Sequence, residues 1–384
     1  MGQFARVRRA YSTALDAAAA ARELHQGLVQ ANLGLVVFFC SPSFDLAVLG
    51  SEIGRLFPGD KVLGCTTAGE ITPAGYMEGS ITGFSISADD CFAAVQLIPA
   101  ISQMQIPHGA AAVDGLIAAL AEQGQAIDLR DTFGMLLIDG MGSTEEIVLT
   151  AVHRRLDPIP LFGGSAGDDM RLEQTHVYHR GRFHTDAALL ALVKISLPFK
   201  VFRHQHYSGT ETRMVVTAAD PGTRIVREIN AEPAGPEYAR IIGMQFADLT
   251  PMTFAEFPVM VRVGGDFYVR SIQKLNDDGS LTFFCAIDEG VVLTLGRHED
   301  MIDSLRRFFH GMREALGAPA LVIGCDCVLR SLEAESRQIK HLASAIMADN
   351  KVIGFGSYGE QFAAMHVNQT FTGVYIAEPV DDAP

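Results

Sequence analysis

Three segments of this chain share one pattern of apolar runs, helical spacing and glycine-rich turns. Each opens with a short apolar run, continues with about four turns of helical sequence and ends in a second apolar run. A turn rich in Gly, Ser and Thr follows and closes on Gly and an acid. Two strands joined by a helix form a parallel pair with a right-handed crossover. The repeat therefore predicts a mixed α/β fold, with helices packed on sheets that arose by duplication. The segments span residues 35–70, 135–169 and 321–360.

The rest of the sequence predicts further elements and the domain limits. Residues 13–32 and 299–316 have the spacing of helices, and residues 236–243 that of a short helix. A hairpin is expected around the turn at 276–279. The first duplicated unit ends near residue 197. The predicted organisation is an N-terminal helix within residues 1–32 as part of the first domain, the main part of that domain at 33–197, a connecting segment at 198–237, a second domain at 238–379 and a disordered tail at 380–384.

The charge and hydropathy of the chain limit its partners. The formal net charge is −15, from 30 basic and 45 acidic side chains. This charge repels phosphate backbones and anionic lipid surfaces, so we expect neither nucleic acid nor a membrane surface as partner. No apolar run approaches the roughly 18 residues of a membrane helix, and a run of alanines with Arg22 and Glu23 behind it replaces the core of a secretory signal. We expect a cytoplasmic protein.

The second glycine turn matches the G-x-S-x-G pattern of serine hydrolases at residues 163–167. The same turn recurs twice without this serine pattern, and the hydrolase elbow requires a helix where strand-like sequence follows here. We therefore expect a structural turn and no enzyme. Successive backbone N–H groups in such turns form a nest that holds anions. The candidate ligand-binding residues at the turns are Thr66, Gly69, Ser165, Gly167, Ser357 and Gly359.

One close cysteine pair, Cys325 and Cys327, lies in the third segment. Two thiolates this near can join a zinc site or act as a redox switch. A zinc site needs four ligands, and no second Cys or His pair stands at zinc-finger spacing. Free cysteine is also among the most buried residue types, so two structural thiols are the alternative.

Five histidines fall close together, at positions 176, 179, 184, 204 and 206. Aromatic residues and four cations (Arg180, Arg182, Lys200 and Arg203) accompany them. Haem iron takes an imidazole ligand and sits in an apolar slot, with cations available for its propionates. The cluster is thus a candidate metal or haem site, although single histidines more often have only solvent or hydrogen-bond contacts.

The three glycine–acid turns together resemble the FIST family of sensory domains over nearly the whole chain. The turns that carry the likeness are residues 63–70, 163–169 and 354–360. Residues 33–197 are similar to a FIST N-terminal domain and residues 238–377 to a FIST C-terminal one. Residues 205–207, 268–273 and 281–290 are similar to the nitric-oxide-sensing haem proteins of the family, the NosP-type subgroup.

That resemblance implies a bacterial, cytosolic haem protein that senses nitric oxide and acts on a partner histidine kinase, with effects on cyclic-di-GMP and biofilms. It implies haem bound at His206, with His204 and His184 as alternatives and Arg203 nearby. Nitric oxide would weaken the bond to the histidine and shift the protein between two states. The alternatives are a FIST sensor that binds a small organic ligand, such as an amino acid, at the glycine turns without haem, and a hydrolase at Ser165. A homodimer is compatible with each.

Overall fold

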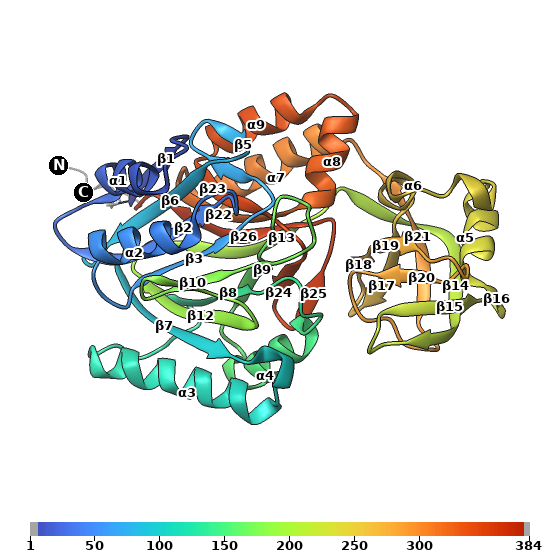
Figure 1. The fold of residues 1–384 in the computed structure, drawn as a ribbon, viewed down its shortest axis with the longest axis horizontal. Coiled ribbons are helices and arrows are strands. Elements are labelled where there is room, and N and C mark those ends of the chain that lie inside the picture. Colours follow the sequence, from blue (N-terminus) through green and yellow to red (C-terminus); the bar gives the residue numbers. More distant parts are fainter. Residues whose placement is uncertain (1–6, 380–384) are drawn as a thin grey trace.

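The structure, a computed structural model, describes residues 7–379 and contains three similar units and one smaller domain (Figure 1). The predicted tail at 380–384 lies outside these residues. The first unit comprises β1 (Val7–Ser12), α1 (Ala17–Leu28), β2 (Leu33–Cys40), α2 (Leu46–Leu56), β3 (Val62–Thr66), β4 (Glu70–Thr72), β5 (Gly75–Met77) and β6 (Ile81–Ser87). The second comprises β7 (Cys91–Pro99), a 3-10 turn (Ile101–Gln103), α3 (Ile106–Glu122), β8 (Thr132–Ile138), α4 (Glu145–Leu156), β9 (Leu161–Ser165), β10 (Val177–His179), β11 (Arg182–His184) and β12 (Ala187–Ile195). The third comprises β13 (Phe199–His204), α7 (Met301–Leu316), β22 (Pro319–Cys327), α8 (Val328–Ser336), α9 (Lys340–Asp349), β23 (Val352–Ser357), β24 (Glu360–Phe362), β25 (Met365–Val367) and β26 (Phe371–Ala377).

Each unit forms the greater part of a six-stranded mixed sheet. The parallel pairs are β2 with β3, β8 with β9 and β22 with β23, and the remaining pairs in these sheets are antiparallel. The prediction of mixed α/β sheets built from duplicated strand-helix-strand units is therefore confirmed.

The three units exchange their short hairpins. The β4–β5 hairpin of the first unit pairs with β23 of the third, and the β24–β25 hairpin of the third pairs with β9 of the second. The β10–β11 hairpin of the second pairs with β3 of the first. Each sheet is thus completed by a strand pair from another unit, and the three units form one body.

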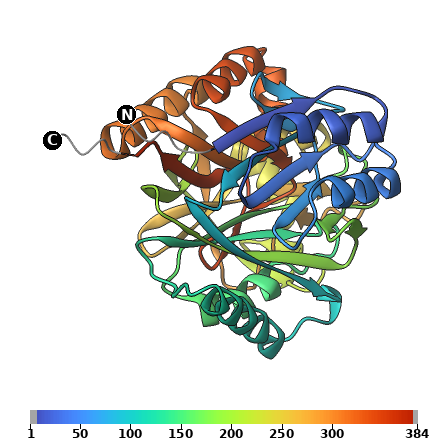
Figure 2. The same ribbon diagram turned by 90° about the vertical axis from the view of Figure 1, so that its left-hand side faces the viewer.

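The body has one central core and three outer cores. Alternate residues of a strand face opposite sides of its sheet. Val37 and Phe39 of β2 therefore join the central core, together with inward residues of β8 and β22, whereas Val36 and Phe38 face α1 and α2. The second and third sheets are covered in the same way by α3 with α4 and by α7 with α9. Figure 2 shows the three units around a common centre, with their helices on the outside.

The smaller domain is inserted into the third unit, between β13 and α7 (Figure 1). Its eight-stranded sheet encloses a separate apolar core. Residues 198–237, predicted as a connecting segment, contain β13 of the body and the first strands of this domain, so the chain is divided differently from the expectation. The elements of the smaller domain are β14 (Tyr207–Asp220), β15 (Ile225–Ile229), β16 (Glu232–Pro233), α5 (Ala234–Ile242), a 3-10 turn (Phe246–Asp248), α6 (Pro251–Glu256), β17 (Val259–Val263), β18 (Asp266–Arg270), β19 (Ile272–Leu275), β20 (Leu281–Phe283) and β21 (Val292–His298).

Local differences from the predicted elements have simple causes. The first helix begins after Asp16, whose carboxylate caps it, rather than at residue 13. The expected hairpin around 276–279 is present and joins β19 to β20, and β18 pairs with β17. Within residues 7–379, no helix is both long and apolar enough to span a membrane.

Candidate functional site

The three glycine turns meet at the centre of the body and bond to one another. Gly167 donates its N–H to the carbonyl of Thr66 at 3.0 Å, Ala68 to Gly356 at 2.9 Å, and Ser165 to Gly359 at 2.8 Å. Thr66, Ser165 and Ser357 are fully buried. These donors, predicted to hold an anionic ligand, are already used between the turns, so the structure does not show the open nest that the prediction requires.

Two turns end in a buried glutamate held by hydroxyl groups. Glu70 accepts hydrogen bonds from Thr67 and Ser80, and Glu360 accepts them from Ser357 and Thr370. Burial raises the pKa of Glu70 to about 7 and that of Glu360 to about 8, although the hydrogen bonds partly oppose it. These acids are structural counterparts in the first and third units.

Ser165 has the surroundings of a structural residue. Its hydroxyl accepts a hydrogen bond from Gln361 Nε2 at 3.0 Å and is fully buried. A loop and β10 follow it, where a hydrolase elbow has a helix. These contacts favour the prediction of a structural turn over that of a nucleophile.

His206 lies fully buried in the link between β13 and β14 and has partners at both ring nitrogens. Nδ1 lies 2.7 Å from an Arg330 guanidinium nitrogen, and Nε2 lies 2.8 Å from Glu333 Oε2. Because arginine only donates, Nδ1 accepts and Nε2–H donates to Glu333. Arg330 also donates to Asp326 at 2.6 Å. Burial lowers the pKa of His206 to about 4, so the ring is neutral at neutral pH.

These partners do not fit His206 as a ligand of haem or zinc. A metal-bound imidazole ordinarily donates its second N–H to an acceptor, but here that position faces the Arg330 guanidinium. His298 Nδ1 lies 3.2 Å from Glu333 Oε1 without the alignment of a hydrogen bond. His206, His298 and Glu333 do bring ligand atoms within 4.8 Å of one another, and among residues 7–379 no other such group occurs. The arginine nevertheless opposes metal binding at His206.

The other residues predicted around haem lie apart from one another. His204, on β13, is buried and stacks on Phe308 at 4.9 Å. Arg203 donates to the carbonyl of Phe267 and lies over the ring of Tyr268. His184 lies on β11, in a different sheet. The structure thus separates the five clustered histidines into a group on the β10–β11 hairpin and a group at the start of the smaller domain.

Cys325 and Cys327 are buried on β22. Burial raises the pKa of both thiols well above the usual value, which disfavours the thiolate that zinc binding and oxidation need. Neither belongs to a cluster of three or more metal-ligating side chains within the described part of the chain. Their surroundings fit structural thiols better than a zinc or redox site.

A groove between α2 and the β10–β11 hairpin collects part of the predicted haem surroundings. Its volume is about 850 Å³, and its lining includes His176, Tyr178, Phe183, Arg180 and Arg182. Burial lowers the pKa of His176, which favours its neutral imidazole form.

A second pocket, which we call the interdomain pocket, lies between the body and the smaller domain. Its volume is about 320 Å³. The body contributes Glu145 and Tyr358, the latter from the third glycine turn, and the smaller domain contributes Arg224 and Lys274. Arg224 crosses the interface and bonds to Glu145 at 2.7 Å. Lys274 has no ion-pair partner among residues 7–379, so its charge is available to a ligand.

Beside this pocket, the interface contains buried polar atoms without partners. Both ring nitrogens of His366, Nδ2 of Asn368 and Oγ of Ser271 have none among the described residues. A Cβ added at Gly359 would lie 2.2 Å from the His366 ring, so glycine is needed there for the ring to fit. Buried polar groups normally have hydrogen-bond partners. These four atoms therefore lack the partners that buried polar groups normally have.

Comparison with known proteins decides the family. Residues 34–232 match the FIST N domain, and residues 234–363 match the FIST C domain. The chain belongs to the FIST family. FIST domains are sensor domains of signal transduction. The limit between the two matches falls within the smaller domain of this FIST protein. A relative, the uncharacterized protein MJ1623 of Methanocaldococcus jannaschii, is 23% identical over 359 residues, which cover 83% of this chain and 68% of the relative.

Several polar residues of this FIST protein escape the sequence analysis. Asp326 with Arg330, and Glu333 with Arg337, stand at the i, i+4 spacing of helical ion pairs, which is a usable signal. Arg224 and Lys274 carry no such signal. Arg224 bonds to Glu145, and Lys274 lines the same pocket, only because the inserted domain folds back onto α4.

Proposed function

We propose that this FIST protein senses a small zwitterionic organic ligand, of the amino-acid class, in the interdomain pocket. The observation that carries the proposal is that both domains and the third glycine turn wall this pocket. Its lining includes a free ammonium group at Lys274 and a carboxylate at Glu145, which complement the carboxylate and ammonium of an amino acid. Small-molecule sites favour such domain interfaces.

Binding there would couple to the position of the smaller domain. A ligand shifts a conformational equilibrium only by its difference in affinity for the two states. The interface is held by polar contacts, such as Arg224 with Glu145 and the Ala286 N–H with Glu146, and it leaves the ring nitrogens of His366 without hydrogen-bond partners. A ligand that bridges the two domains favours the closed arrangement. We propose that a partner histidine kinase reads this difference.

The test is a thermal-shift screen of the full chain against the standard amino acids and related carboxylates. A true ligand at about 100 times its Kd stabilises the folded state by about 2.7 kcal/mol. Lys274→Ala is expected to abolish the shift, and Lys200→Ala, an exposed lysine on β13, to preserve it. If no compound shifts Tm, or if Lys274→Ala shifts as wild type does, the proposal is wrong.

A second candidate function is the haem-based sensing of nitric oxide that the resemblance implies. The observation that favours it is the groove beside His176, with aromatic walls and two arginines. His176 would supply the axial imidazole, and Arg180 and Arg182 the cations for the propionates. The bound haem would supply the iron that takes nitric oxide. Arg180 already pairs with Asp60 at 2.6 Å, so one propionate would have to compete with that carboxylate.

Haem titration followed by absorption spectroscopy tests this second candidate. We expect a saturating Soret band that shifts with nitric oxide in wild type, remains in His206→Ala and is lost in His176→Ala. An unchanged band in His176→Ala would refute the assignment of the axial ligand. A broad, non-saturating band in wild type would refute haem sensing altogether.

A further inference from the structure

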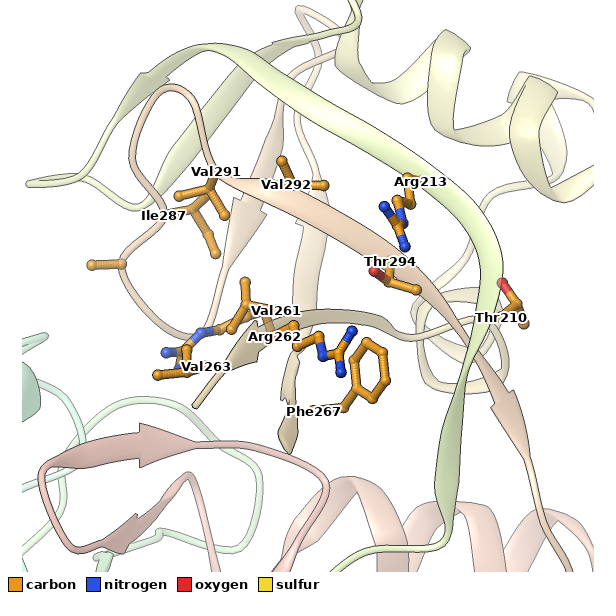
Figure 3. Close-up of a pocket in the computed structure, with 12 residues that line it drawn as sticks. Thr210, Arg213, Val261, Arg262, Val263, Phe267, Ile287, Val291, Val292 and Thr294 are labelled. Atoms are coloured by element: carbon orange, nitrogen blue, oxygen red, sulfur yellow. The ribbon is translucent and has the colours of Figure 1, made fainter. Parts of the chain in front are cut away.

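A pocket on the smaller domain, which we call the arginine pocket, combines unneutralised cations with apolar walls. Its volume is about 620 Å³, within the range of pockets that bind small molecules. Three arginines line it, Arg213 of β14, Arg262 of β17 and Arg270 of β18, and no acidic residue does. Figure 3 shows Arg213, Arg262 and Phe267 arranged around this space.

Two of these arginines lack a carboxylate partner. The side chain of Arg213 makes no hydrogen bond or ion pair with any described residue, and it is exposed. Arg262 makes one long hydrogen bond, at 3.3 Å, to the carbonyl of Gly265, and its guanidinium lies 5.7 Å from the Phe267 ring centroid. Their positive charge stands out in a chain whose net charge is −15. A concave site lined by one sign of charge attracts ligands of the other sign.

The walls of the pocket are apolar and partly exposed. Val263 and Val292 are each 48% exposed, and Val261 and Ile287 form a buried floor between them. The register of β14 against β21 shifts between Gly209 and Arg213, which interrupts the ladder at the edge of the pocket. The exposed valines leave apolar surface in contact with water, and the two guanidinium groups have no anionic partner. A ligand with an apolar body and an anionic head would satisfy both.

We propose that the arginine pocket is a second ligand site, separate from the interdomain pocket, which takes an amphipathic carboxylate with an aliphatic body. The planar guanidinium groups of Arg213 and Arg262 match a carboxylate, with which arginine forms paired, charge-assisted hydrogen bonds. The valines would contact the aliphatic part. The site also touches the interface, because Arg270 donates to the carbonyl of His366 in the body.

Isothermal titration calorimetry on the full chain tests the proposal, with decanoate as the probe. Decanol, with the same chain and no charge, and acetate, with the same head and no chain, are the comparison compounds. We expect one saturable decanoate site, at least tenfold tighter than decanol, and no measurable binding of acetate. The double variant Arg213→Gln/Arg262→Gln is expected to weaken decanoate at least tenfold and to leave decanol unchanged. Both residues are exposed, so this variant keeps its fold.

The controls separate this site from the rest of the molecule. Arg297→Gln, an exposed arginine on β21 outside the pocket, should bind decanoate as wild type does. Lys274→Ala should also leave decanoate binding unchanged, whatever becomes of amino-acid binding. Equal decanoate affinity in wild type and in the double variant would overturn the proposal, as would loss of decanoate binding in Lys274→Ala.

Discussion

Replacing Arg330 by Met is expected to lower the free energy of unfolding by about 3–5 kcal/mol, the usual cost of breaking a buried ion pair from one side. Arg330 is only 1% exposed and donates to Asp326 and to His206. Without it, the buried carboxylate of Asp326 keeps the hydroxyl of Tyr76 as its remaining side-chain partner. The large loss of stability comes from leaving this buried charge without its cation.

Urea unfolding of two further variants makes this prediction specific. Arg337→Met removes the other arginine near this cluster, a half-exposed side chain that pairs with Glu333, and should cost below about 1 kcal/mol, as surface pairs do. The double variant Asp326→Asn/Arg330→Met should recover part of the loss, because it removes both charges. If Arg330→Met lowered the free energy of unfolding no more than Arg337→Met does, Arg330 would not be coupled to Asp326 and His206 as a buried ion pair.

Raising the pH from 5 to 9 is expected to destabilise the protein through Glu360 and Glu70. Their folded-state pKa values, about 8 and about 7, lie above the usual value of 4.5. An acid whose pKa is raised by folding contributes stability below its unfolded pKa, and that contribution is lost as pH rises through the folded pKa. For Glu360 the full contribution is on the order of 3–5 kcal/mol.

Comparison with Glu360→Gln isolates the part due to this residue. The amide resembles the protonated acid, so the variant should match wild type within about 1 kcal/mol at pH 5 and exceed it in stability at pH 9. Glu335→Gln, an exposed glutamate on α8, is the matched control and should follow the wild-type curve. Parallel curves for wild type and Glu360→Gln would show that Glu360 is ionised in the folded protein.

The sequence predicts the repeated units well, because the patterns that indicate a buried strand and a glycine turn each lie within a few adjacent residues. Gly64 and Gly354, for example, occupy the same place in their units, and each lies against the backbone of the neighbouring strand. The exchange of hairpins could not be predicted in this way. Nothing near Ile71 indicates that it pairs with Gly354.

The site predictions were limited in the same way, because the contacts that decide them join residues far apart in the chain. His206 was a reasonable haem ligand from its neighbours in sequence, but its role depends on Arg330 and Glu333, which α8 brings to it from far along the chain. The interdomain pocket needs Lys274 and Glu145 in one lining, and only the inserted domain brings these two residues to the same pocket.

The hairpin exchange also has a consequence for how the chain is made. The β4–β5 hairpin leaves the ribosome well before its partner strand β23, which follows much later in the chain. Ile71, fully buried in the finished body, therefore stays uncovered until β23 has been synthesised. Strands that wait for distant partners fold slowly and are exposed to aggregation. A fragment that stops after the FIST N match, at residue 232, would retain this hairpin without the sheet edge it pairs with.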